Sequence, residues 1–145
     1  MRILVDADAC PVKDIIEEIA MAFNLPVILF ANPSHHIHST YSELVLTDGS
    51  SQAVDLALTN MANKGDVVVT QDYGLACMVL AKGAFAINPS GMVFSDNNID
   101  ILMMQRYFNW KARHQGQRII SPKKRNKSND EKFRINLVNL VEKNL

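Results

Sequence analysis

The sequence predicts an α/β protein built on a five-stranded parallel sheet with helices on both faces. Short runs rich in Val, Ile and Leu alternate with stretches of helical periodicity over the first hundred residues, which is the pattern of parallel strands joined by helical crossovers. Several of these runs are apolar at consecutive positions, as in strands that are buried on both faces. We expect strands at 3–6, 27–31, 43–46, 66–70 and 84–87.

Between these strands, apolar residues recur at the three- and four-residue spacing of helices. The first helical stretch begins at Pro11, which fits the first position of a helix because that position needs no N–H donor. The last stretch is amphipathic, and the polar segment 121–130 before it is predicted to be a mobile loop. We expect helices at 11–23, 52–63, 73–82, 97–110 and about 130–144.

The length of 145 residues, with 48% hydrophobic and 21% charged residues, predicts a single soluble domain over 1–145. Its charge is unevenly divided. Residues 1–100 hold four basic and twelve acidic residues, a net charge of −8, whereas residues 101–145 hold eleven basic and three acidic residues, a net charge of +8. An acidic body with a basic segment at 111–130 predicts carboxylates that hold cations and basic side chains that hold an anion.

Several protein classes are excluded by the same composition. No apolar run approaches the ~20 residues that span a bilayer, so we expect no membrane protein. The N-terminus lacks the charged start and the small-residue cleavage site of a signal peptide. Two cysteines cannot build a disulfide scaffold or a four-cysteine zinc site. Free thiols predict a cytoplasmic protein.

Four aspartates are candidate metal ligands and catalytic residues. Ligands of an open parallel sheet bind at the carboxyl ends of its strands. Asp6 closes the first predicted strand, and Asp8 follows two residues later, so an extended backbone aims both the same way. Asp72 follows the fourth strand at the same offset, and Asp55 lies near the start of the second helix. Four converging carboxylates repel one another unless cations are present, so they predict a site for Mg²⁺ or Mn²⁺.

These aspartates also have structural interpretations, which the sequence leaves open. Asp72 would cap the third helix, and Asp55 would complement the dipole of the second. The run that begins at Asp6 also resembles the D-x-D motif of aspartate-nucleophile phosphatases. However, the fifth position of that motif is Cys10, and the Gly65–Asp66 pair precedes the fourth strand instead of following it. The phosphatase interpretation is therefore the weaker one.

The basic segment predicts contacts with nucleic acid, and single-stranded RNA is the expected partner. Trp110 and His114 lie beside it and suit base stacking. A solvated surface is the structural alternative. The apolar residues of the helix at 97–110 suit either core packing or contact with a second copy, as in a homo-oligomer. The residues expected to contact phosphates are Arg118, Lys123, Lys124, Arg125 and Lys127.

Four runs of the sequence resemble the YaiI/YqxD family of small, largely uncharacterised bacterial proteins. That family is similar to the PIN-like nuclease superfamily. The resemblance implies a three-layer fold with strand order 3-2-1-4-5, in which strands one and four are neighbours, and a metal-dependent nuclease acting on RNA. The runs are VDADACPVKD (5–14), KGDVVVTQDYGLA (64–76), AINPSG (86–91) and SPKKR (121–125).

By position, the resemblance assigns the strand-end acids of the superfamily to Asp6 and Asp72 and its helical acid to Asp55. The chain departs from the family pattern at Ser90, where an arginine is usual, and at Ser121, where a glycine is usual. An arginine contact near the fifth strand is therefore absent.

The resulting hypothesis is that a water activated by the metal attacks phosphorus. Thr70 and Asn88, at neighbouring strand ends, would orient water or phosphate. The rival hypothesis is a non-catalytic module that binds nucleic acid or protein through its basic segment. In that case the aspartates have structural roles only.

Overall fold

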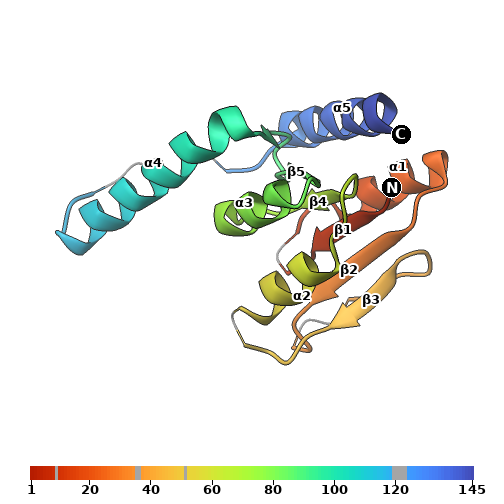
Figure 1. Ribbon diagram of the computed structural model, residues 1–145, viewed down its shortest axis with the longest axis horizontal. Coiled ribbons are helices and arrows are strands. Elements are labelled where there is room, and N and C mark those ends of the chain that lie inside the picture. The colour runs from red at the N-terminus through yellow and green to blue at the C-terminus, as the bar shows by residue number, and fades with distance from the viewer. Residues whose placement is uncertain (9, 35–36, 51, 119–123) are drawn as a thin grey trace.

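A six-stranded sheet forms the centre of the protein (Figure 1). The computed structural model describes residues 1–8, 10–34, 37–50, 52–118 and 124–145. The sheet has the strand order β3-β2-β1-β4-β5-β6, and its first five strands in that order are parallel. The strands are β1 (Ile3–Asp6), β2 (Val27–Ala31), β3 (Glu43–Leu46), β4 (Val67–Val69), β5 (Phe85–Ile87) and β6 (Val93–Phe94).

The sixth strand corrects the prediction of a five-stranded, wholly parallel sheet. The parallel strands do follow the predicted order, but β6 pairs with β5 in the antiparallel direction. The chain reverses over a few residues because Asn88 Oδ1 accepts the N–H groups of Ser90 and Met92, and Gly91 adopts a φ of 97°. A parallel partner would need a crossover of about a dozen residues. Two residues are too few to show strand periodicity in a sequence.

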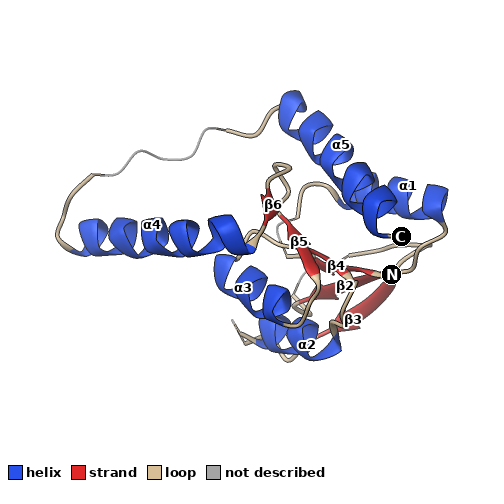
Figure 2. Cartoon of the chain, turned by 45° about the horizontal axis from the view of Figure 1, so that its top comes forward, coloured by secondary structure: helices blue, strands red, loops and turns tan. Residues whose placement is uncertain are grey.

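Among the described residues, five helices are placed around this sheet, and four of them cover its faces in two pairs (Figure 2). On one face, α1 and α5 pack Ile16 and Phe133 against Ile3. On the other face, α2 and α3 pack Leu58 and Leu75 around β1 and β4. This three-layer arrangement explains why the central strands are apolar at every position except Asp6, which ends β1. The helices are α1 (Lys13–Phe23), α2 (Ala53–Met61), α3 (Tyr73–Ala81), α4 (Asp96–His114) and α5 (Lys127–Asn144).

Two helix starts differ from the prediction. Pro11 lies in a turn, and α1 begins two residues later, after Val12 at the N-cap position. Residues 127–130, predicted to be loop, form the first turn of α5. Asn126 starts this helix because its side chain accepts the N–H groups of Ser128 and Asn129, which satisfies donors that a helix start leaves unpaired.

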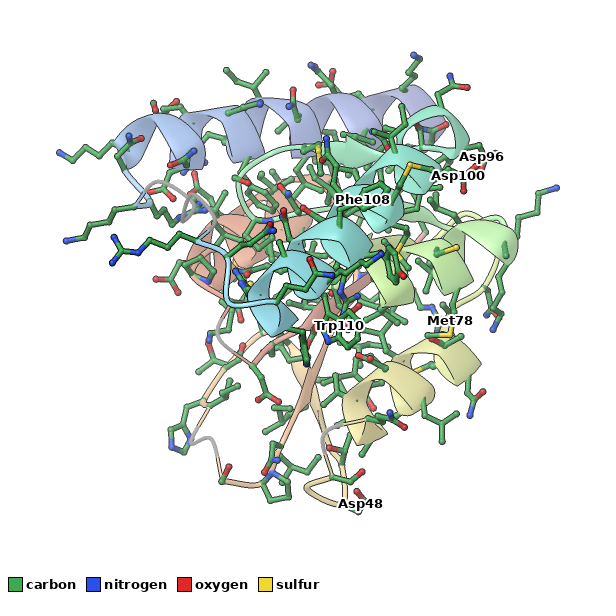
Figure 3. All side chains as sticks on the ribbon, turned by 90° about the vertical axis from the view of Figure 1, so that its left-hand side faces the viewer. Asp48, Met78, Asp96, Asp100, Phe108 and Trp110 are labelled. Carbon is green, nitrogen blue, oxygen red and sulfur yellow. The ribbon has the colours of Figure 1, made fainter. Side chains whose placement is uncertain are left out.

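The helix α4 leaves the body of the protein on the side where the parallel strands end (Figure 1). Its first turns are anchored by Ile99, which is buried against the α3 side of the sheet. Further along, Phe108 and Trp110 lie on opposite sides of the helix (Figure 3), and each is more than half exposed. Across the described residues, no helix combines the length and the apolarity that crossing a bilayer requires.

Candidate functional site

Asp6 and Thr70 meet because β1 and β4 are neighbours in the sheet. Val5 is in register with Val69, so the residues that follow them emerge side by side at the carboxyl edge. The hydroxyl of Thr70 donates a 3.0 Å hydrogen bond to Oδ2 of Asp6. Thr70 itself is only 1% exposed. Its hydroxyl therefore holds the carboxylate of Asp6 at the mouth of the site.

Asp72 is tied into the same group through the backbone. Its N–H donates a 3.0 Å hydrogen bond to the hydroxyl of Thr70. Its Oδ1 accepts the N–H groups of Gly74 and Leu75 at 2.8 and 3.2 Å. Asp72 is thus the N-cap of α3, as its structural interpretation predicted. The cap orients the carboxylate without removing it from the site, because its side chain remains one-third exposed.

Asp55 reaches this group from the first turn of α2. Its pKa is raised to about 6, first by burial and then by the negative charge of Asp72 and a hydrogen bond with it. The charge of Asp6 adds to the rise, and that of Arg106 opposes it. The three carboxylates come from β1, α2 and the start of α3. Asp55 therefore lies within reach of the negative charges of both strand-end acids.

The pKa of Asp6 is raised as well. Burial is the main cause, and the hydrogen bond from Thr70 opposes it. The charges of Asp8 and Asp72 raise this pKa further. The edge of the sheet therefore concentrates negative charge, which a cation would relieve.

Asp8 occupies a different position from the other three aspartates. Its two carboxylate oxygens accept the N–H of Asn32 at 3.2 Å each, just beyond the end of β2. This contact links the ends of β1 and β2. The charge of Asp8 thus raises the pKa of Asp6, while the carboxylate of Asp8 is hydrogen-bonded on the β2 side of the edge.

Arg106 is a basic residue of this site that no pattern in the sequence predicted. Its Nη1 lies 3.5 Å from Oδ1 of Asp72, although 34 residues separate them. Arg106 and the two strand-end acids line a cavity of about 400 Å³ together with Gln71 and Tyr73. No sequence motif marks Arg106, because only the packing of α4 beside α3 brings it to the carboxylates.

The chain is similar to known proteins of one family. A family model described as "Uncharacterized BCR, YaiI/YqxD family" matches residues 4–143. The chain belongs to this family. Among its relatives, a UPF0178 protein of Clostridium tetani (strain Massachusetts / E88) is 44% identical over 99% of this chain and 98% of that relative. A UPF0178 protein of Clostridium kluyveri (strain NBRC 12016) is 46% identical over 97% of this chain and 93% of that relative. No solved structure matches the chain.

In this member of the YaiI/YqxD family, Asn88 and Arg125 border a second cavity, of about 440 Å³, which shares Gln71 and Tyr73 with the first. Asn88 Oδ1 is occupied by the N–H and hydroxyl of Ser90 and by the N–H of Met92. Its carboxamide oxygen thus builds the turn after β5.

Arg125 is held on the body of the protein. Its guanidinium pairs with Asp130 at 2.5 Å and donates to the carbonyl oxygen of Pro89 at 2.7 Å. These contacts tie the start of α5 to the turn after β5. Arg118, Lys124 and Lys127 are exposed, as a phosphate-binding role requires, and Lys123 lies outside the described residues.

The number and spacing of the carboxylates decide whether they suit a cation. Among the described residues, no three His, Cys, Asp or Glu side chains lie close enough to hold a metal ion by themselves. Magnesium is usually bound by one or two carboxylates and completes its shell with waters and substrate oxygens. One or two of the carboxylates of Asp6, Asp55 and Asp72 fit a cation held in that way.

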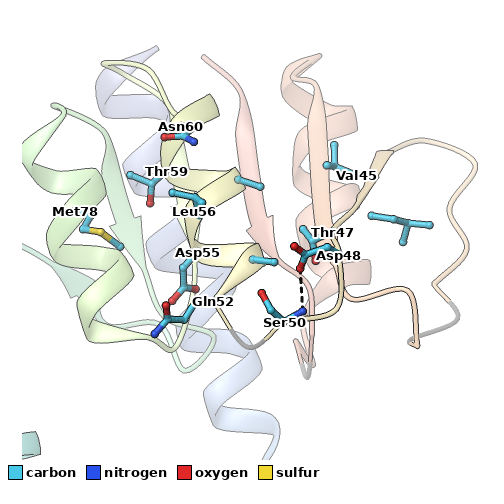
Figure 4. Close-up of a pocket in the computed structure, with 13 residues that line it drawn as sticks. Val45, Thr47, Asp48, Ser50, Gln52, Asp55, Leu56, Thr59, Asn60 and Met78 are labelled. Atoms are coloured by element: carbon cyan, nitrogen blue, oxygen red, sulfur yellow. Dashed lines mark hydrogen bonds between the residues drawn. The ribbon is translucent and has the colours of Figure 1, made fainter.

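A further cavity, of about 810 Å³, lies between α2 and the loop that follows β3 (Figure 4). Asp55 lines it together with apolar side chains such as Val45, Leu56 and Met78. In this loop, the N–H of Ser50 donates to Oδ1 of Asp48 at 3.0 Å. Asp55 therefore borders both this apolar hollow and the group of carboxylates.

Proposed function

We propose that this chain is a divalent-cation-dependent phosphodiesterase that cleaves RNA on a PIN-like fold. The observation that carries the proposal is the meeting of Asp6, Asp55 and Asp72 from three separate elements, with the pKa of Asp6 and Asp55 raised partly by their neighbours' charge. Such repulsion costs stability, and proteins concentrate it at sites where the charges act together. The resemblance to PIN-like nucleases supports the same chemistry.

In this proposal one or two of the carboxylates of Asp6, Asp55 and Asp72 bind Mg²⁺ or Mn²⁺ directly and the others act through its waters, and Asp8 adds its charge. The cation, when bound, would supply positive charge to the phosphoryl oxygens and acidify a water. Thr70 orients the carboxylate of Asp6 through its hydroxyl.

Basic residues would hold the phosphates of the substrate. Arg106 stands beside Asp72 with a side chain that is 57% exposed, and a guanidinium suits two phosphoryl oxygens at once. Asn88 shapes the turn at the neighbouring cavity, where it would position a phosphate. Further along the RNA, contacts would come from Arg118, Lys123, Lys124 and Lys127. The guanidinium of Arg125 is already engaged by Asp130 and Pro89.

The test combines metal binding with cleavage. Mn²⁺ should raise the thermal midpoint of the wild-type protein, because a ligand bound only to the folded state stabilises it. The same ion should support cleavage of an end-labelled single-stranded RNA. Asp6→Asn should abolish both effects while leaving the fold intact or more stable, since it relieves repulsion. Asp100→Asn, which removes an exposed acid of α4, is the matched control and should change neither.

A non-catalytic module that binds nucleic acid or protein is the second candidate. The capping bonds of Asp72 favour it, because they give this acid a structural role. In that case Asp6→Asn and Asp72→Asn would leave Mn²⁺ affinity unchanged, and purified protein would bind RNA without cleaving it. That result would overturn the nuclease proposal.

A further inference from the structure

Three exposed rings form a stripe along one face of α4. Tyr107, Trp110 and His114 follow one another at helical spacing of three and four residues, so they share a face. The rings of Tyr107 and Trp110 are stacked at 6.2 Å with planes 24° apart, and the ring centroids of Trp110 and His114 are 4.0 Å apart. Nδ1 of His114 lies 2.9 Å from the carbonyl oxygen of Trp110, which can only accept a hydrogen bond. This bond fixes the imidazole over the indole. We call these three residues the aromatic stripe.

The aromatic stripe is open to solvent. Tyr107 and Trp110 are each 54% exposed, and His114 is also exposed. Contiguous exposed aromatic surface indicates an interaction site. Stacking fits a flat ligand better than a globular apolar one.

The position of the stripe relates it to the carboxylates. The helix α4 extends past the carboxyl edge of the sheet (Figure 1). Arg106 comes one residue before Tyr107 and reaches Asp72 at 3.5 Å. One end of the aromatic stripe therefore lies next to the acidic site, and the stripe leads outward from it.

Basic side chains flank the stripe. In helical projection, Arg106 and Arg113 fall on one side of it and Lys111 on the other. The chain from residue 101 onward carries a net charge of +8. Rings with cations along both sides match the chemistry of a nucleic-acid strand, with bases to stack and phosphates to neutralise.

We propose that the aromatic stripe of α4 binds the unpaired bases of a single nucleic-acid strand and leads that strand to the carboxylates. This inference rests on the proposed function, because it names the strand that the acidic site receives. Bases stack on Tyr107, Trp110 and His114, and phosphates contact the flanking basic residues. Stacking needs an accessible base face, so the stripe selects unpaired strands over duplexes.

A second copy of the chain suits the stripe less well. If two copies of α4 packed stripe against stripe, Arg106, Lys111 and Arg113 of each copy would face the same residues of the other. Like charges brought together in this way oppose association. A polyanion relieves the same charges.

The experiment uses the full-length protein in EDTA, so that binding is measured without cleavage. Trp110 is the only tryptophan, and its fluorescence should be quenched when oligouridylate stacks on it. By fluorescence anisotropy of a labelled oligouridylate, Trp110→Ala and Tyr107→Ala should each weaken binding by about fivefold or more. Trp110→Phe should retain most of the affinity. Phe108 is no suitable control, because its ring lies 5.8 Å from that of Tyr107. Ile101→Ala, which removes an exposed apolar side chain from the other side of α4, should bind as the wild type does.

Three results would overturn this inference. One is an unquenched Trp110 at saturating oligouridylate. Another is an equal loss of affinity in Ile101→Ala and Trp110→Ala. The third is a wild-type dimer, seen by light scattering, that Trp110→Ala converts to a monomer without a change in RNA affinity. If RNA binds through the stripe but Mn²⁺ supports no cleavage, the proposed function is wrong and the stripe inference holds. If Mn²⁺ supports cleavage that the stripe variants do not affect, the stripe inference is wrong and the proposed function holds.

Discussion

The hydroxyl of Thr70 donates a 3.0 Å hydrogen bond to the carboxylate of Asp6 across the boundary between β4 and β1. The same hydroxyl oxygen accepts the N–H of Asp72 at 3.0 Å. One buried side chain thus sets the spacing between the two strand-end acids. Its bond to Asp6 favours the ionised carboxylate, because it lowers a pKa that burial and neighbouring charges raise.

Thr70→Val should therefore weaken metal binding without removing any carboxylate. The pKa of Asp6 should rise further, and the N–H of Asp72 should lose its partner. We expect a loss of about 1–3 kcal/mol in the free energy of unfolding from these lost bonds. Urea denaturation and Mn²⁺ titration measure the two effects. Thr70→Ser keeps the hydroxyl and serves as the control, so the site model would be wrong if both variants lost Mn²⁺ affinity equally.

The raised pKa of Asp55 predicts how stability depends on pH. The folded protein holds this proton up to about pH 6, whereas the unfolded chain loses it near pH 4. Stability therefore falls as pH rises between these values, and the cost persists at neutral pH. Asp55→Asn should stabilise the metal-free protein at pH 7 by about 1 kcal/mol, discounted for the partial exposure of the group.

This gain from Asp55→Asn should disappear in thermal melts at pH 4, where both proteins are neutral at this position. Saturating Mn²⁺ should also reverse it at pH 7, because the wild type alone keeps the ligand. A purely dipole-complementing aspartate predicts the opposite sign at pH 7, namely a loss of about 0.3–1 kcal/mol. The sign of the change therefore separates the two roles of Asp55.

Gly91 has a packing role that can be tested directly. A Cβ at this position would lie 2.8 Å from backbone atoms of Lys132 and Phe133 in α5, and its φ is 97°. Gly91→Ala should cost about 2–4 kcal/mol, because α5 must move away from the turn and the backbone is strained. Gly116→Ala, where φ is also positive but no atom lies within 4 Å, should cost only about 1 kcal/mol. Equal urea midpoints for the two variants would contradict this account.

The basic residues at the start of α5 and just before it divide into two groups by their contacts. Lys124 and Lys127 are exposed, so replacing both with Ala should weaken single-stranded RNA binding and flatten the log–log salt dependence by about 0.7 per lost contact. Stability should not change. Arg125→Ala should instead lower the unfolding midpoint, because Asp130 and the carbonyl oxygen of Pro89 lose their partner. An unchanged salt slope in the double lysine variant would make these lysines a solvated surface.

Much of the fold was predictable because its signals are local. Runs of apolar residues predicted all five parallel strands, and helical spacing predicted the five helices to within a few residues at most ends. The positions of Asp6 and Asp72 after buried strands were visible for the same reason. Parallel strands share one carboxyl edge, so residues that end them had to lie at that edge.

Contacts between distant segments could not be predicted from local sequence patterns. The two-residue strand β6, the approach of Arg106 to Asp72 and the anchoring of Arg125 at Pro89 all depend on how helices and turns pack. Asp8 shows the same limit, since its predicted direction did not reveal its bonds to Asn32 beyond the neighbouring strand.

The sequence by itself determined the layered α/β class, the order of its elements and the residues that stand at the ends of its strands. Hydrophobic periodicity and strand ends are properties of a few consecutive residues, so they can be read without a structure. Tertiary structure alone decided which carboxylates lie close enough to repel one another, which basic side chain pairs with them and where the stripe on α4 lies. These depend on distances between segments tens of residues apart, which packing of the whole chain establishes.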